Sequence, residues 1–280
     1  MTVIDAHQHF WELGRGDYRF PRPGDPVLYR DFLPDRLAPL LRSSGVDQTI
    51  LVQATDSFAE TEFLLHLAST TPFVAGVVGW WDPRAPDGLA QIERLAEDSR
   101  LVGVRPMLQG VDDISFILGP DSLADLHRMA GRGLVFDALI DPSQLRTIAE
   151  LCRSVPSLKI VVDHMAKPWR MPGQLESWAA GMRELAAHRN CAVKVSGFPF
   201  ASPGASAETV EALVTVLREA FGVDRLLWGS DWPVAEREGG YSMVLNRMQA
   251  LFSVAERHEV FGHNAEMIYG LPRQKASLTK

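Results

Sequence analysis

Two histidines stand two residues apart at the end of the first apolar run of the chain. His7 and His9 follow the segment TVIDA and flank Gln8. Successive side chains of a β-strand point to opposite faces, so a strand here directs both imidazoles to the same side. Such a pair can bind a metal ion, move protons or bind an anionic substrate. The choice among these depends on what other elements bring to the same place.

Polar residues also end the later apolar runs of the sequence. They can accept protons, donate protons or bind ions, and they are Gln53, Asp82, Arg105, Asp137, Asp163, His164, Lys194, Ser196 and Asp231. An unpaired buried charge is costly, so these groups either pair with one another or line a functional cavity. We predict a catalytic site in which His7, His9, Arg105, His164 and Asp231 converge.

The elements that must position these residues alternate regularly along the chain. Short runs rich in β-branched residues predict strands at 2–7, 48–54, 73–81, 101–108, 134–140, 158–164, 192–197 and 225–231. Amphipathic stretches predict helices at 34–45, 59–71, 87–98, 122–133, 143–154, 175–188, 207–222 and 241–252. Eight such strand–helix units indicate an α/β protein with a (β/α)8 barrel, whose site lies at the carboxyl ends of the strands.

The series is uninterrupted, which predicts a single domain over residues 1–280. An open doubly wound sheet is the alternative, but the first strand lacks the glycine-rich loop that often follows it there. The long irregular loop from Glu12 to Phe32 is expected to form a lid or a wall of the substrate site. One more short helix is expected within GHNAEMIYGL.

Composition narrows the function classes. Hydrophobic residues make up 46% and charged residues 22%, as in folded globular proteins, and the net charge of -7 argues against nucleic acid or an anionic membrane as partner. The absence of an apolar run of spanning length and of a signal-like start predicts a cytoplasmic protein. Cys152 and Cys191 are expected to be buried free thiols. The helices do not indicate an oligomeric state.

Five motifs in a fixed order carry a resemblance: HQHFW, DHMAKP, KVSGF, GSDWP and GHNAEMIYGL. Together they resemble the amidohydrolase superfamily, and more narrowly its branch of sugar lactonases, such as fuconolactonase and rhamnonolactonase, and pyrone dicarboxylate lactonases. The resemblance implies a distorted (β/α)8 barrel that hydrolyses an ester or amide with water activated by a metal or an aspartate. Its functional residues carry over as His7, His9, His164 and Asp231.

Two departures from the superfamily pattern bear on the metal. Members with two metals have a modified lysine or a glutamate near the end of strand four, where this chain has Arg105, and commonly a histidine on strand five, where it has Asp137. A fixed cation at Arg105 would repel two metals at close range. We expect at most one divalent ion, Zn2+ or Mn2+, held by His7, His9, His164 and Asp231, and metal-independent lactonases also occur in this branch.

The expected mechanism uses Asp231 as the general base toward water, with His7, His9 or Arg105 holding the carbonyl oxygen. His164 either binds that oxygen or orients Asp231, and the sequence leaves both roles open. The GxSxG pattern of a serine nucleophile is absent.

A small sugar lactone is the expected substrate, because aromatic faces pack on the ring and polar groups bind its hydroxyls. The predicted substrate-binding residues are Trp11, Arg15, Tyr18, Gln53, Trp81 and Trp232. One alternative is a carboxylated lactone of the pyrone dicarboxylate or muconolactone type, bound by Arg15, Arg105, Lys167 and Arg170. The sequence also leaves open a related metal-dependent decarboxylase and a non-catalytic metabolite-binding barrel.

Overall fold

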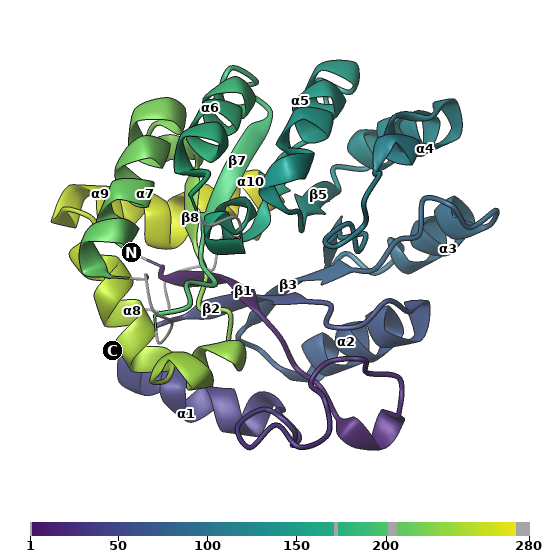
Figure 1. The fold of residues 1–280 in the computed structure, drawn as a ribbon. Coiled ribbons are helices and arrows are strands. Elements are labelled where there is room, and N and C mark those ends of the chain that lie inside the picture. Colours follow the sequence, from purple (N-terminus) through teal and green to yellow (C-terminus); the bar gives the residue numbers. More distant parts are fainter. Residues whose placement is uncertain (1, 171–172, 201–205, 273–280) are drawn as a thin grey trace.

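The computed structural model describes residues 2–170, 173–200 and 206–272. Its eight strands are β1 (Ile4–Gln8), β2 (Gln48–Val52), β3 (Val74–Gly79), β4 (Leu101–Val104), β5 (Val135–Ala138), β6 (Ile160–Val162), β7 (Cys191–Val195) and β8 (Leu226–Trp228). They form one parallel sheet in the order β1 to β8, and helices lie around its outside (Figure 1). The prediction of a barrel built from eight strand–helix units is therefore confirmed.

The helices that follow the strands agree with the predicted series to within a few residues. They are α1 (Pro34–Ser44), α2 (Phe58–Thr70), α3 (Gly88–Leu95), α4 (Pro120–Gly131), α5 (Leu145–Ser154), α6 (Leu175–Ala186), α7 (Ala207–Phe221) and α8 (Tyr241–Ala250). Two short helices, α9 (Val254–His258) and α10 (Asn264–Tyr269), end the described chain. The sequence predicts only α10 of these two. No helix in the described ranges is long and apolar enough to cross a membrane.

Closure of the sheet depends on the segment that follows β8. A parallel bridge joins Gln8 to Trp232, and backbone hydrogen bonds run from Asp231 N to His7 O (2.8 Å) and from His9 N to Trp232 O (2.7 Å). These bonds bring the ends of β1 and β8 side by side. The two histidines and Asp231 are thus placed together by the backbone itself.

Two apolar clusters occupy the two faces of the sheet. The larger lies between strands and helices, whereas the smaller joins alternate strand residues, such as Ile50, Val78 and Val135, to Tyr269 and Leu271 at the C-terminal end. Alternate side chains of a barrel strand fill its interior, so the smaller cluster is the barrel core. The C-terminal helix α10 closes this core at one end.

The loop from Glu12 to Phe32 packs against the barrel. An antiparallel bridge joins Trp11 to Phe32, and Arg237 after β8 forms an ion pair with Asp25 and lies 5.6 Å above the Phe20 ring.

Cys152 and Cys191 are buried free thiols, as predicted.

Candidate active site

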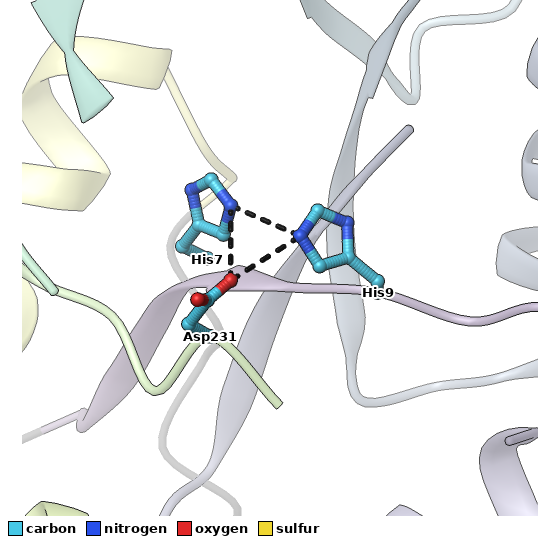
Figure 2. A group of neighbouring side chains, drawn as sticks. All are labelled: His7, His9 and Asp231. Carbon is cyan, nitrogen blue, oxygen red and sulfur yellow. Dashed lines mark hydrogen bonds and ion pairs between the residues drawn. The ribbon is translucent and has the colours of Figure 1, made fainter. Parts of the chain in front are cut away.

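Four of the predicted catalytic residues meet where the strands end. His7 Nε2 lies 3.2 Å from His9 Nε2 and 3.7 Å from Asp231 Oδ1, and His9 Nε2 lies 3.4 Å from the same oxygen (Figure 2). His164 Nε2 is 3.9 Å from Asp231 Oδ1. One carboxylate oxygen therefore faces three imidazole nitrogens.

A break in strand alternation lets His7 join this group. Ala6 packs in the barrel core, yet the next residue, His7, contacts Lys194 and Asp163 in the interior as well. The register between β1 and β2 shifts between Asp5 and Gln8, as a β-bulge would produce. Bulges re-aim side chains beside active sites.

Left-handed backbone positions the residues that come from β6 and β8. His164, Met165, Ala166 and Lys167 all have φ between 51° and 55°, and Asp231 has φ of 58°. Such conformations are unfavourable for residues other than glycine and cluster at functional sites. The turn after β6 carries both His164 and Lys167 to the site cavity.

Close packing against glycines fixes two of the imidazoles. A Cβ atom at Gly197 would lie 2.5 Å from His164 Nδ1, and one at Gly229 would lie 2.5 Å from His7 Cβ. Both distances are far below van der Waals contact. Because glycine has no Cβ atom, these two positions provide the space that the His164 and His7 side chains occupy.

Hydrogen bonds orient the outer nitrogens of His9 and His164. His9 Nδ1 lies 2.7 Å from the carbonyl oxygen of Val52, which can only accept, so Nδ1 donates. His164 Nδ1 lies 2.9 Å from the Ser196 hydroxyl. Each of these two rings thus directs Nε2 toward Asp231.

Burial and neighbouring charges set the ionisation of the group. Burial lowers the pKa of His7 and of His164 well below the ordinary value, which keeps both rings neutral near pH 7. Burial opposes the charged form of Asp231, but His164, His9 and Lys167 favour it, and the net result is a pKa below the ordinary value. Asp231 is therefore an available carboxylate, and the His7 and His164 rings beside it are neutral.

Arg105 lies at the site but is held by the protein. It donates to Asp163 Oδ2 at 3.0 Å and to the carbonyl oxygen of Gln53, and it lies 3.5 Å from His7 Nε2. Its side chain is 4% exposed. The guanidinium faces the histidines while two of its nitrogens are already engaged.

A cavity of about 410 Å³ opens over the group. Its lining includes His9, His164, Asp231 and Arg105 together with Trp11, Phe20, Met107, Gln109, Lys167 and Arg237. A second cavity of about 380 Å³ shares Phe20, Ala54, Met107 and Gln109 with it and reaches Trp81. Both volumes are ordinary for small-molecule sites.

The predicted substrate-binding residues are divided among several places. Trp11 lines the cavity above Asp231, and Trp81 lines the adjoining cavity. Gln53 is buried, and its amide donates to the Arg105 carbonyl at 3.0 Å. Three others lie outside the described lining of both cavities: Arg15 pairs with Asp17 at 2.8 Å, Tyr18 is half-buried near Glu60, and the Trp232 indole donates to Glu236 at 2.9 Å.

Sequence reasoning missed several residues of the cavity wall. Phe20 and Gln109 lie in loops, where periodicity gives no signal, although Phe20 belongs to the loop expected to form a lid or wall. Met107 lies in the segment predicted as a strand at 101–108, and Arg237 lies in a short 3-10 helix, Val234–Glu238; neither pattern marks a cavity residue. Lys194 and Asp163 stand at the ends of predicted strands, but their position alone did not assign them to the site. The structure places both against His7.

The three grouped side chains fit a metal ion. Zinc bound tetrahedrally at about 2.0–2.1 Å keeps its ligand atoms about 3.3 Å apart. The three separations among His7 Nε2, His9 Nε2 and Asp231 Oδ1 run from 3.2 to 3.7 Å. With three protein ligands, such a site leaves a position for water or substrate, as catalytic zinc sites do.

Comparison with known proteins identifies the family of this chain. Residues 4–271 match the sequence profile of the amidohydrolase family. An L-fucono-1,5-lactonase of Burkholderia ambifaria is 43% identical over 278 residues, or 96% of each chain, and one of Burkholderia multivorans is 35% identical, again over 96% of each. The crystal structure of an amidohydrolase of B. multivorans with bound zinc has a TM-score of 0.89 and 34% identity, covering 97% of this chain and 100% of that one.

Proposed function

This chain belongs to the amidohydrolase family, and from that premise we propose that it hydrolyses a small sugar lactone, of the L-fuconolactone class, to the aldonic acid. The observation that carries the proposal is the Asp231 carboxylate, ionised and surrounded by three imidazoles at the floor of a small cavity. The two lactonases of Burkholderia, similar over nearly their whole length, support the substrate class.

Asp231 acts as the general base. Its Oδ1 accepts a proton from a water molecule as the water oxygen attacks the lactone carbonyl carbon. The lowered pKa of Asp231 keeps this carboxylate charged at neutral pH. When the ring C–O bond breaks, protonated Asp231 returns the proton to the departing alkoxide, so the base is regenerated.

Imidazole donors stabilise the negative charge that develops on the carbonyl oxygen. Close packing of His7 against Gly229 and of His164 against Gly197 supports donors that are positioned before substrate arrives. Preorganised donors of this kind contribute most to the transition state. Arg105, fixed by Asp163, adds a positive charge 3.5 Å from His7.

A divalent metal held by His7, His9 and Asp231 would polarise the carbonyl oxygen or the water when it is bound. Nitrogen and oxygen ligands of this kind suit Zn2+ or Mn2+. The spacing of the His7, His9 and Asp231 ligand atoms supports the binding of one ion. Arg105 and Lys194 are both close to His7, and these cations disfavour a second ion there.

Pairing of the nearby cations favours a neutral sugar lactone over a carboxylated one. Of the four cations that a carboxylated substrate would use, Arg15 pairs with Asp17, Arg105 with Asp163 and Arg170 with Asp141. Lys167 contacts the neutral Gln109 side chain at 2.6 Å. The carboxylated lactone is therefore the second candidate substrate, and decarboxylation is the third candidate reaction.

We also propose a cytoplasmic location for the protein.

Proton release tests this function. Chelator-treated protein is mixed with aldonolactones of the fucono, galactono, arabinono and rhamnono series, and zinc or manganese is then added back. Hydrolysis of a neutral lactone is the expected result, before or after metal. Turnover only of carboxylated lactones would favour the carboxylated substrate instead, release of carbon dioxide would favour the decarboxylase, and binding without turnover would favour the metabolite-binding barrel.

A further inference from the structure

One cation of the active-site cavity differs from the others in its partners. The cationic side chains that line this cavity are Arg105, Lys167 and Arg237. Arg105 forms an ion pair with Asp163 at 3.0 Å, and Arg237 forms one with Asp25. Among the described residues, no carboxylate forms an ion pair with Lys167. The charge of Lys167 is therefore left for a group that enters the cavity.

The contact that Lys167 does make is with a neutral group. Its Nζ donates to the amide oxygen of Gln109 at 2.6 Å, which satisfies one N–H and leaves the charge in place. Lys194 shows the contrast, because its fully buried ammonium forms an ion pair with Asp137 and lies 3.1 Å from Asp163 Oδ1. A structural lysine in a protein interior has its counter-charges in the protein. An ammonium without one, at the wall of a cavity, is typical of a ligand site.

The backbone after β6 is held in the conformation that brings Lys167 to the cavity. Lys167 has φ of 51° and ψ of 60° and ends the left-handed turn that begins at His164. Its backbone N–H donates to the His164 carbonyl at 2.8 Å, and the Trp178 indole donates to the Met165 carbonyl at 2.7 Å. Such a conformation persists only where the surrounding structure imposes it, and it clusters at functional sites. One turn thus supplies both an imidazole and an ammonium to the cavity.

Hydrolysis of a neutral lactone creates a negative charge in this cavity. The water oxygen bonds to the carbonyl carbon, the ring C–O bond breaks, and the resulting carboxylic acid releases its proton to solvent near pH 7. The new carboxylate forms beside Asp231, because Asp231 activates the attacking water. Two like charges this close repel each other unless a cation lies near both. Burial lowers the pKa of Lys167, whereas the Asp231 charge raises it, so these two side chains are close enough for their charges to interact.

We propose that Lys167 binds the carboxylate of the sugar acid that the reaction forms, and that the site therefore takes aldonates as ligands as well as neutral lactones. This assignment rests on the proposed function, because lactone hydrolysis is what places a carboxylate beside Asp231. A charged ammonium–carboxylate hydrogen bond is roughly twice as strong as a hydrogen bond between neutral groups. The product is therefore expected to compete with the lactone for the site.

The test compares two ligands that differ at one group. L-fuconate and L-fucitol carry the same hydroxyls, but fuconate ends in a carboxylate where fucitol ends in CH2OH. Isothermal titration calorimetry at pH 7 on chelator-treated protein gives both Kd values without any turnover. Wild-type protein should bind fuconate about tenfold or more tightly than fucitol. In Lys167→Met this preference should be lost while the Kd for fucitol changes little, and Lys167→Arg, which keeps the charge, should bind fuconate more tightly than Lys167→Met.

Two further variants separate this role from general effects. Arg237→Met removes a cavity cation that is already paired with Asp25, so it should change the preference for fuconate less than about threefold. Gln109→Glu gives Lys167 an internal carboxylate and should lower the preference even though Lys167 is present. This variant also decides the matter if Lys167→Met does not fold, which circular dichroism shows.

Three results would overturn the assignment: a wild-type protein without a preference for fuconate, a preference retained in Lys167→Met or Gln109→Glu, or equal losses in Lys167→Met and Arg237→Met. The lactone assay tests the proposed function separately. Hydrolysis of lactones without a preference for fuconate that depends on Lys167 contradicts the assignment alone. A preference that depends on Lys167 in a protein that hydrolyses no lactone contradicts the proposed function and leaves an aldonate-binding site.

Discussion

One carboxylate oxygen of Asp231 lies close to three imidazole rings. It lies within 3.9 Å of Nε2 of His7, His9 and His164, and its side chain is 12% exposed. The oxygen is therefore reachable from the cavity while its charge is stabilised from the protein side. A general base needs both properties.

Replacing this residue gives the first prediction. Asp231→Asn keeps the size and the acceptor oxygen but cannot take a proton from water, so kcat should fall about 100- to 10,000-fold. The free energy of unfolding should change by about 1 kcal/mol or less, since the amide still fits among the imidazoles. Steady-state kinetics and urea unfolding measure the two effects. Retention of more than a tenth of the wild-type kcat would remove Asp231 from the role of base.

The second prediction concerns the pH dependence of the same residue. Catalysis needs the carboxylate, and the pKa of Asp231 lies below the ordinary 3.8. In metal-free protein, kcat/KM should therefore stay level as the pH falls toward about 4, until the protein unfolds. Stopped-flow proton release in weak buffers, with circular dichroism as a check on folding, measures this. An acidic limb centred near pH 6 in folded protein would contradict it.

At the scale of elements, local periodicity accounts for most of what the sequence predicted. All eight strands and the helices between them follow from β-branched runs and amphipathic repeats, which depend on short-range pattern. Local patterns do not predict the bulge in β1 or the left-handed turn from His164 to Lys167. Their conformations are held by long-range packing, such as Gly197 beneath His164, which no local pattern reveals. Site residues at strand ends were thus predictable, whereas the network of Lys194 was not.

The close approach of β8 to β1 gives the third prediction. A Cβ at Gly229 would meet His7 Cβ at 2.5 Å and the His7 backbone nitrogen at 3.1 Å. Gly229→Ala should displace His7, lower kcat at least tenfold and destabilise the fold by about 1–3 kcal/mol. Gly131→Ala, at the end of α4 with no atom within 4 Å, is the matched control and should be neutral or slightly stabilising. Equal behaviour of the two variants would refute the packing argument.

The start of α2 contains a buried carboxyl group. Glu60 is fully buried, accepts from the backbone nitrogens of Ala54 (2.8 Å) and Thr55 (2.6 Å), and faces Asp17. Burial raises its pKa from 4.5 to about 8. The native state therefore binds more protons than the unfolded state between these values, and stability falls as the pH rises through that window.

Glu60→Gln tests this fourth prediction. The variant loses one acceptor, a cost that does not change with pH, but it cannot ionise. Its free energy of unfolding relative to wild type should therefore increase between pH 5 and pH 8, by an amount on the order of 2–4 kcal/mol. Urea unfolding of both proteins at several pH values gives the difference. A difference that stays constant with pH would place the Glu60 pKa near its ordinary value.

At the scale of the whole molecule, helix α10 completes the barrel core. Tyr269 of α10 is 3% exposed in the barrel core, and its hydroxyl donates to Asp137 at 2.7 Å, next to Lys194. Helix α10 thus connects the closed end of the barrel to the buried charged residues Asp137 and Lys194. The Tyr269 side chain therefore contributes both to the packing of the barrel core and to the hydrogen bonds of Asp137.

Two substitutions at Tyr269 separate these contributions. Tyr269→Ala empties part of the core and should cost about 3–5 kcal/mol, whereas Tyr269→Phe keeps the ring and loses only the hydrogen bond, at about 1–2 kcal/mol. Met267→Ala, on the exposed side of the same helix, should change stability by less than about 0.5 kcal/mol. Chemical unfolding of the three variants measures the series. If Met267→Ala and Tyr269→Ala cost the same, α10 stabilises the protein as a surface helix and does not close the barrel core.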